Sequence, residues 1–95
     1  PVELDLLLEK IDGVKEAAAF SIPDDTLGER VGAAIVLEDP AKPVDLEAIS
    51  AYFESQGVAK FKTPEGVMII EALPRNPVGK VQRFVLNEIY QAQNA

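Results

Sequence analysis

Two apolar runs joined by one short polar connection place the strongest constraint on how this chain folds. Residues 14–22 include "AAAFSI", and residues 31–37 include "GAAIVL". Gly13 and Pro23 bracket the first run, which favours a strand even though alanine itself prefers helix. The connection "PDDTLGER" is too short for a helical crossover, so we expect the two strands to pair antiparallel.

Helical periodicity and stop signals predict three helices around these strands. Residues 1–11 begin with Pro1, which suits a first helical turn, and place four apolar residues on one face: Leu4, Leu7, Leu8 and Ile11. Residues 45–56 have Asp45 as an N-cap and Gly57 as a C-terminal stop. Residues 81–92 form the last expected helix, and residues 67–70 a short third strand.

The expected order is therefore α-β-β-α-β-α. It predicts an α+β fold in which helices cover a small, mainly antiparallel three-stranded sheet. A length of 95 residues is typical of one domain, so we expect a single domain over residues 1–95.

Charge and composition exclude several classes of function. The net charge of −7 opposes binding to nucleic acid or to an anionic membrane surface. The sequence has no cysteine and no histidine. The lack of cysteine fits a cytoplasmic protein. No apolar run approaches the ~20 residues of a membrane span. Asp24, Asp25 and Glu29 do not have a metal-ligand spacing, so we predict no metal site.

The segment "ALPRNPVGK" presents one lysine, Lys80, behind two prolines and a glycine. It is not a phosphate-binding P-loop, because Pro74 stands at the first glycine position and Val81 follows the lysine in place of Ser or Thr. Pro74 stiffens the approach, and Gly79 allows unusual dihedral angles. A lysine held at the tip of such an arm suits a negative charge on a phosphate or carboxylate oxygen, although most surface lysines are simply solvated.

The segment "LPRNPVGKVQR" resembles the C-terminal signature of the acyl-adenylate-forming superfamily: Leu-Pro, a few residues, Gly-Lys, two residues and a basic residue. That superfamily contains acyl- and aryl-CoA synthetases, adenylation domains of non-ribosomal peptide synthetases, and luciferase. The segment "AKFKTPEGV" is similar to its Tyr/Phe-Lys-x-Pro motif, and the first 37 residues resemble its opening helix and strand pair. The resemblance covers nearly the whole chain in the right order.

This resemblance implies a role for Lys80. The family's signature lysine reaches into the active site of a larger N-terminal domain, contacts the carboxylate substrate and the α-phosphate of ATP, and promotes acyl-adenylate formation. The domain then rotates so that a thiol can enter. Gly79 and Pro74 would support the lysine. The N-terminal domain, absent here together with the hinge, would be the partner and would bind most of ATP and Mg²⁺.

The resemblance also implies a possible contact with coenzyme A (CoA) or a carrier-protein phosphopantetheine at Phe61, with charge from Lys60 and Lys62. An aromatic face can stack on adenine. The alternative is that Phe61 is a half-buried packing residue. Glu65 stands where a basic residue can occur in such enzymes, and it would repel CoA phosphates. We interpret Arg83 as structural, paired with an acidic neighbour.

We therefore expect the mobile C-terminal domain of an ATP-dependent acyl-CoA synthetase, an AMP-forming acid–thiol ligase. Two alternatives are the same domain of an aryl or amino-acid adenylation enzyme that loads a carrier protein, and a non-catalytic α+β interaction module. Because the chain starts at Pro1 without methionine, we expect a piece of a longer protein. We expect the isolated domain to be inactive.

Overall fold

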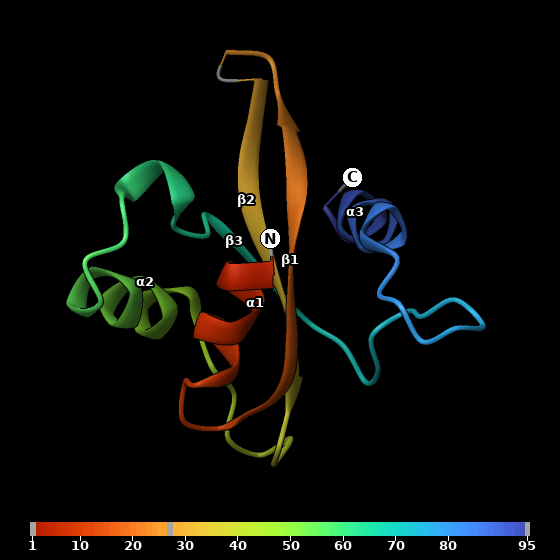
Figure 1. Ribbon diagram of the computed structural model, residues 1–95, viewed down its shortest axis with the longest axis horizontal. Helices are drawn as coiled ribbons and strands as arrows, with labels where there is room; N and C mark the ends of the chain where they lie inside the picture. The colour runs from red at the N-terminus through yellow and green to blue at the C-terminus, as the bar shows by residue number, and fades with distance from the viewer. Residues whose placement is uncertain (1, 27, 95) are drawn as a thin grey trace.

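The computed structural model describes residues 2–26 and 28–94, so the expected role of Pro1 in the first helix lies outside the described residues. Three helices and three strands follow each other in the predicted order, which is confirmed (Figure 1). The elements are α1 (Val2–Glu9), β1 (Val14–Asp24), β2 (Gly28–Leu37), α2 (Leu46–Ser55), the 3₁₀ turn η1 (Lys60–Lys62), β3 (Gly66–Ile69) and α3 (Arg83–Gln93). None of the helices in the described ranges is long and apolar enough to cross a membrane.

The sheet has the order β1-β2-β3, with one long and one short ladder. β1 and β2 pair antiparallel from Val14↔Leu37 to Asp24↔Gly28, as predicted. β3 pairs parallel to β2, from Gly32↔Gly66 to Ile35↔Ile69. The chain path permits this parallel pairing, because α2 and η1 lie between β2 and β3 and supply the crossover that parallel neighbours require.

The prediction that "PDDTLGER" is a polar connection is wrong at both of its ends. Strand pairing continues through Pro23↔Glu29 and Asp24↔Gly28, so the strands extend into this segment. Pro23 is tolerated because β1 is an edge strand. A proline there can lack its N–H on the open side of the strand, where no ladder hydrogen bond is lost. An ion pair between Arg30 and Asp24, 3.6 Å apart, lies beside the extended pairing.

Both faces of the β1–β2 pair are buried, which explains why their sequences are nearly continuous apolar runs. α1 and α2 lie on one side of the sheet and α3 on the other (Figure 1). The residues buried on the first side include Leu8, Ala17, Ala19, Ala33, Ile35, Ile49 and Phe53. Those on the second side include Ala18, Phe20, Ile22, Ala34, Val36, Met68, Leu73 and Leu86.

The predicted start and stop signals of α2 are present, whereas α1 ends earlier than predicted. The Asp45 side chain accepts a hydrogen bond from the Ala48 N–H at 2.8 Å, which confirms the N-cap. Gly57 has a φ of +73°, in the region that favours glycine at a helix stop. α1 ends at Glu9, before the expected Ile11, and Ile11 instead bonds back to Leu8 at 3.1 Å in a tighter turn.

A close approach fixes β3 beneath α3. A Cβ on Gly66 would lie 2.5 Å from the Tyr90 hydroxyl oxygen, and a Cβ on its strand neighbour Gly32 would lie 2.6 Å from the Phe20 ring. The two rings pack against each other with centroids 5.5 Å apart. The absence of side chains at both glycines therefore makes the space that this aromatic pair occupies.

A network centred on Asp5 joins α1, β1 and α3. Arg83 donates from Nη1 and Nη2 to the two carboxylate oxygens of Asp5, at 2.9 and 2.6 Å. The same carboxylate accepts from the Ala19 N–H at 2.7 Å, and Arg83 donates to the Ala19 carbonyl at 2.7 Å. Ala19 lies on an edge strand, so these bonds satisfy backbone groups that point away from β2. The structural interpretation of Arg83 is confirmed.

We expect Arg83→Met to lower the free energy of unfolding by about 1–3 kcal/mol, because Asp5 and the Ala19 carbonyl both lose a partner. Urea unfolding of the 95-residue chain measures this loss. Asp5→Leu combined with Arg83→Met should cost less than the sum of the two single changes. Arg75→Met is the control, since its ion pair with Glu16 is more exposed and is worth about 0–1 kcal/mol. An equal loss from both arginine variants would contradict a special role for the Asp5 network.

Candidate functional site: the Lys80 hairpin

Lys80 lies in a short hairpin formed by residues 75–81, closed by a bridge between Arg75 and Val81. The Gly79 N–H donates to the Asn76 carbonyl at 2.9 Å, which closes a β-turn with Pro77 at its second position. Gly79 follows with a φ of +89°. This pattern, a turn followed by a left-handed glycine, is common in hairpins with three-residue loops.

Asn76 forms hydrogen bonds with both the backbone N–H and the backbone carbonyl of Lys80. The Asn76 Oδ1 accepts from the Lys80 N–H at 2.9 Å and from the Val78 N–H at 3.1 Å. The Asn76 N–H in turn donates to the Lys80 carbonyl at 2.9 Å. The lysine backbone is therefore fixed by one asparagine, while its side chain is left free.

Arg75 connects this hairpin to the sheet. Its Nη1 donates to the Gly79 carbonyl at 2.8 Å, and its Nη2 donates to Glu16 of β1 at 2.9 Å. The Pro74 carbonyl accepts from the Gln82 N–H at 2.9 Å. Leu73, directly before, is buried in the core beneath α3. The structure thus brings Pro74 and Gly79 together with Lys80 in one anchored unit.

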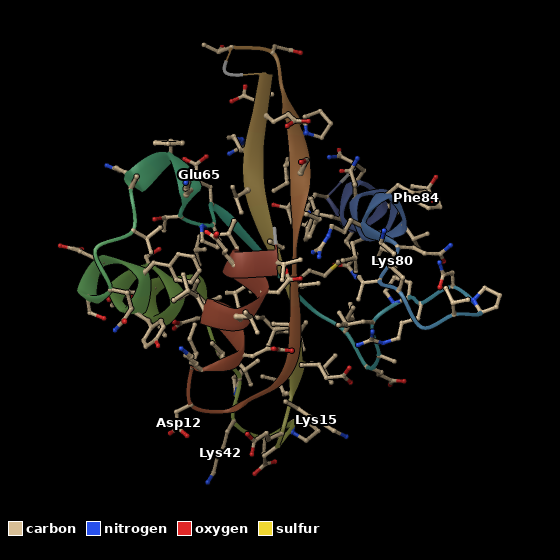
Figure 2. All side chains as sticks on the ribbon, in the orientation of Figure 1. Asp12, Lys15, Lys42, Glu65, Lys80 and Phe84 are labelled. Carbon is tan, nitrogen blue, oxygen red and sulfur yellow. The ribbon has the colours of Figure 1, made fainter. Side chains whose placement is uncertain are left out.

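The Lys80 side chain is exposed, and within residues 2–26 and 28–94 it forms no ion pair (Figure 2). Val78, at the tip of the same hairpin, is 87% exposed. The prediction that a helix begins near Val81 is wrong by a short distance, because α3 begins at Arg83. The Arg75–Val81 bridge and the Gln82 bond to Pro74 keep the intervening residues extended, so Lys80 lies outside the first helical turn.

The 3₁₀ turn η1 lies away from the Lys80 hairpin and consists of Lys60, Phe61 and Lys62. Phe61 is 79% exposed, so the alternative that it is a half-buried packing residue is wrong. The Lys62 ammonium lies 5.8 Å from the centre of the Phe61 ring, at the distance of a cation–π contact. An exposed aromatic ring with an adjacent cation can stack on a planar base.

The structure does not bring these residues to Lys80. η1 lies beside α2 on one side of the sheet, and the Lys80 hairpin lies on the other side with α3 (Figures 1 and 2). Glu65, three residues after the end of η1, is also exposed, and its backbone N–H donates to the Val31 carbonyl of β2 at 2.8 Å. The two groups of predicted site residues therefore form two separate surfaces.

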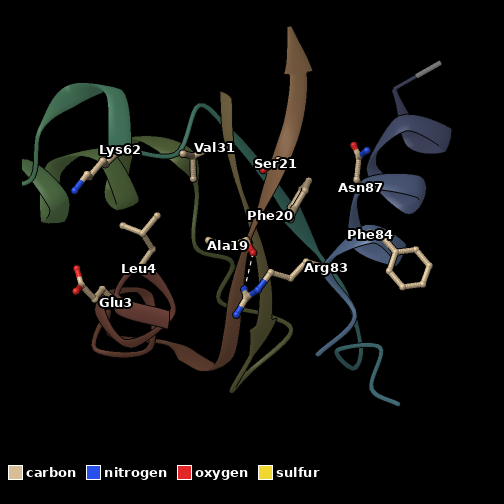
Figure 3. Close-up of a pocket in the computed structure, with 10 residues that line it drawn as sticks. All are labelled: Glu3, Leu4, Ala19, Phe20, Ser21, Val31, Lys62, Arg83, Phe84 and Asn87. Atoms are coloured by element: carbon tan, nitrogen blue, oxygen red, sulfur yellow. Dashed lines mark hydrogen bonds between the residues drawn. The ribbon is translucent and has the colours of Figure 1, made fainter. Parts of the chain in front are cut away.

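A cleft of about 610 Å³ follows the outer edge of β1 between α1 and α3 (Figure 3). The Arg83 side chain crosses it, held by the Ala19 carbonyl and by Asp5. Its lining residues are Glu3, Leu4, Ala19, Phe20, Ser21, Val31, Lys62, Arg83, Phe84 and Asn87. Because both terminal nitrogens of the Arg83 guanidinium bond to Asp5 or to the Ala19 carbonyl, we interpret it here as a structural group.

Sequence reasoning missed Asn76 and Glu16 as parts of the Lys80 site. Asn76 could have been found, because asparagine before proline is typical of a turn in which the side chain bonds to backbone N–H groups further along the chain. Glu16 carries no such signal, since it is 59 residues from Arg75 in sequence and meets it only through the fold.

Comparison with known proteins gives consistent matches in sequence and in structure. The family model for AMP-binding enzyme C-terminal domains matches residues 3–80. A medium-chain fatty-acid–CoA ligase of Escherichia coli is 39% identical over 88% of the chain, and a long-chain-fatty-acid–CoA ligase of Mycobacterium tuberculosis is 38% identical over 97%. The crystal structure of ATP-bound MatB from Rhodopseudomonas palustris superposes with a TM-score of 0.84 at 34% identity, over the whole chain.

The chain corresponds to a small part of each of these proteins. It spans 15% of the Escherichia coli ligase, 18% of the Mycobacterium tuberculosis ligase and 18% of the MatB chain. The family match, these identities and the shared fold agree with the signature around Lys80. The chain belongs to the family of AMP-binding enzyme C-terminal domains.

Proposed function

We propose that this chain is the mobile C-terminal domain of an AMP-forming acyl-CoA synthetase and that Lys80 is its catalytic residue. The observation that carries the proposal is an exposed lysine on a rigid hairpin, with no ion-pair partner among the described residues. Family membership and the CoA ligases among the relatives support it.

The proposed reaction has two steps. A carboxylate oxygen of the acid attacks the α-phosphorus of ATP, the bond to the bridging oxygen breaks, and pyrophosphate leaves. The thiol of the acceptor then gives up its proton to solvent and its sulfur attacks the acyl carbonyl of the adenylate, and AMP leaves with the electrons of the broken C–O bond. Mg²⁺ would neutralise charge on the phosphates. The larger N-terminal domain would hold ATP, Mg²⁺ and the acid, so we propose that the present domain alone is inactive.

Lys80 would act in the first step. The carboxylate and the α-phosphate are both negative and repel each other as they approach, and a cation placed between their oxygens lowers this repulsion. The ammonium of Lys80 has the compact charge that this role requires, and its long stem can reach beyond the surface of the domain. The hydrogen bonds from Asn76 hold the Lys80 backbone, so the reach of the ammonium would come from the torsions of the side chain.

The second step would use the opposite surface. The η1 segment, which contains Phe61, and the hairpin of Lys80 lie on different sides of the sheet, so both could not face the same site at once (Figures 1 and 2). A rotation of the domain between the two steps would withdraw Lys80 and bring the η1 surface toward the thiol substrate. This separation supports the proposed rotation.

We propose CoA as the thiol acceptor. The exposed ring of Phe61 fits stacking on the adenine of CoA, and Lys60 and Lys62 on either side could attract its phosphates. The exposed carboxylate of Glu65 opposes those phosphates, and this observation favours the second candidate, phosphopantetheine on a carrier protein. That candidate needs no nucleotide contact at η1.

For the full-length enzyme, we expect Lys80→Ala to slow adenylate formation about 100- to 1,000-fold, the typical cost of losing one oriented charge stabiliser. Thioester formation from preformed adenylate should change little. Single-turnover measurement of pyrophosphate release and of thioester formation separates the two steps. Lys42→Ala, which removes another exposed lysine far from the hairpin (Figure 2), is the control and should leave both rates unchanged. Equal losses in both half-reactions of Lys80→Ala would contradict the proposed role.

We expect Phe61→Ala to raise the KM for CoA roughly tenfold, because base–aromatic stacking is worth about 1–3 kcal/mol. The rate of adenylate formation should stay the same. Steady-state kinetics at varied CoA, with Phe84→Ala as an exposed phenylalanine control, measures this effect. An unchanged KM for CoA in Phe61→Ala would favour the carrier-protein acceptor.

A further inference from the structure

We infer that Asn76 is a positioning residue for Lys80, supported by the Arg75–Glu16 pair. The inference rests on the function proposed above for Lys80, and it assigns a role to residues that do not themselves carry the catalytic charge. It follows from how the hydrogen bonds of residues 75–81 are distributed.

Asn76 holds the backbone of Lys80 on both sides. Asn76 accepts from the Lys80 N–H at 2.9 Å and donates to the Lys80 carbonyl at 2.9 Å. Both backbone polar groups of Lys80 are thus bound by one residue. The Lys80 Cα therefore has a fixed position and direction, and the flexibility that remains is in the side-chain torsions.

Hydrogen bonds, and not side-chain packing, hold the turn that precedes the lysine. Gly79 has a φ of +89°, and a Cβ placed on it would meet no atom within 4 Å. Packing at Gly79 therefore does not hold the turn. Val78, which is 87% exposed, supplies none either. The turn is held by hydrogen bonds: Asn76 accepts from the N–H groups of Val78 and Gly79, and Arg75 donates to the Gly79 carbonyl at 2.8 Å.

Arg75 links this turn to the sheet. Arg75 holds the Gly79 carbonyl with one nitrogen and Glu16 of β1 with the other. Because the Arg75 and Glu16 side chains are each more than a third exposed, their ion pair contributes little to stability. Its geometric effect is larger, since it ties the peptide directly before Lys80 to the longest strand pair of the domain.

These bonds matter because the proposed partner site of Lys80 belongs to another domain. A lysine delivered by rotation of a whole domain reaches its target only if its loop moves together with the sheet. A loop that shifted by about 1 Å could lower the rate as much as 100-fold. Asn76 fixes the lysine to its turn, and Arg75 fixes the turn to β1.

The test uses the full-length enzyme with Asn76→Ala and Asn76→Asp. Asn76→Ala removes the oxygen that accepts from Lys80 and Val78, whereas Asn76→Asp keeps it. We expect Asn76→Ala to slow adenylate formation roughly 10- to 100-fold, with thioester formation from preformed adenylate unchanged. Asn76→Asp should retain most of the rate. Arg75→Met should slow adenylate formation by a smaller factor, because the Asn76 bonds remain.

A double variant separates positioning from a general structural effect. If Asn76 acts through Lys80, then adding Asn76→Ala to Lys80→Ala should cause no further loss of adenylate formation. An equal additional loss in that background, or an equal slowing of both half-reactions by Asn76→Ala, would overturn the inference. Impairment by Lys80→Ala together with a normal rate for Asn76→Ala would also overturn it while leaving the proposed function intact. A normal rate for Lys80→Ala would instead contradict the proposed function.

Discussion

Burial of β1 and β2 on both faces is the constraint on which the rest of the structure depends. A chain of 95 residues has to cover two faces of one long hairpin, and it does so with α1 and α2 on one side and α3 on the other. Asp5 and Arg83, near opposite ends of the chain, meet at the outer edge of β1 and bind both backbone groups of Ala19. The same edge strand supplies Glu16, which anchors the Lys80 hairpin through Arg75.

Local signals were sufficient to predict much of this fold. The two apolar runs, the Asp45 cap and the glycine stop after α2 each depend on neighbouring residues, and all three predictions are confirmed. The parallel position of β3 and the Asp5–Arg83 bond depend on tertiary packing, and no short window of sequence contains them. The extension of the strands into "PDDTLGER" was missed because Asp, Gly and Pro normally favour turns, while here continued pairing with the partner strand prevails.

In the candidate site, too, some features could be predicted from local sequence and others depend on tertiary packing. The Gly-Lys signature, the prolines and the aromatic-lysine segment could be recognised from sequence, so Lys80 and Phe61 could both be named as candidate site residues. Their placement on separate surfaces and the exposure of Phe61 required the fold. The bonds from Asn76 hold the hairpin, whose tip has no buried packing at Val78 or Gly79. Under the proposed function, the domain thus carries one surface for each half-reaction, and each surface completes a site whose other parts belong to a partner domain.

The most direct test of this account is a crystal structure of the full-length enzyme with a stable acyl-adenylate analogue, in the absence of any thiol. We predict that the Lys80 ammonium lies within hydrogen-bond distance, about 2.7–3.2 Å, of an oxygen at the acyl–phosphate junction. The hairpin of residues 75–81 should keep the bonds described here. A structure in which Lys80 points into solvent while another cation contacts that oxygen would contradict the account.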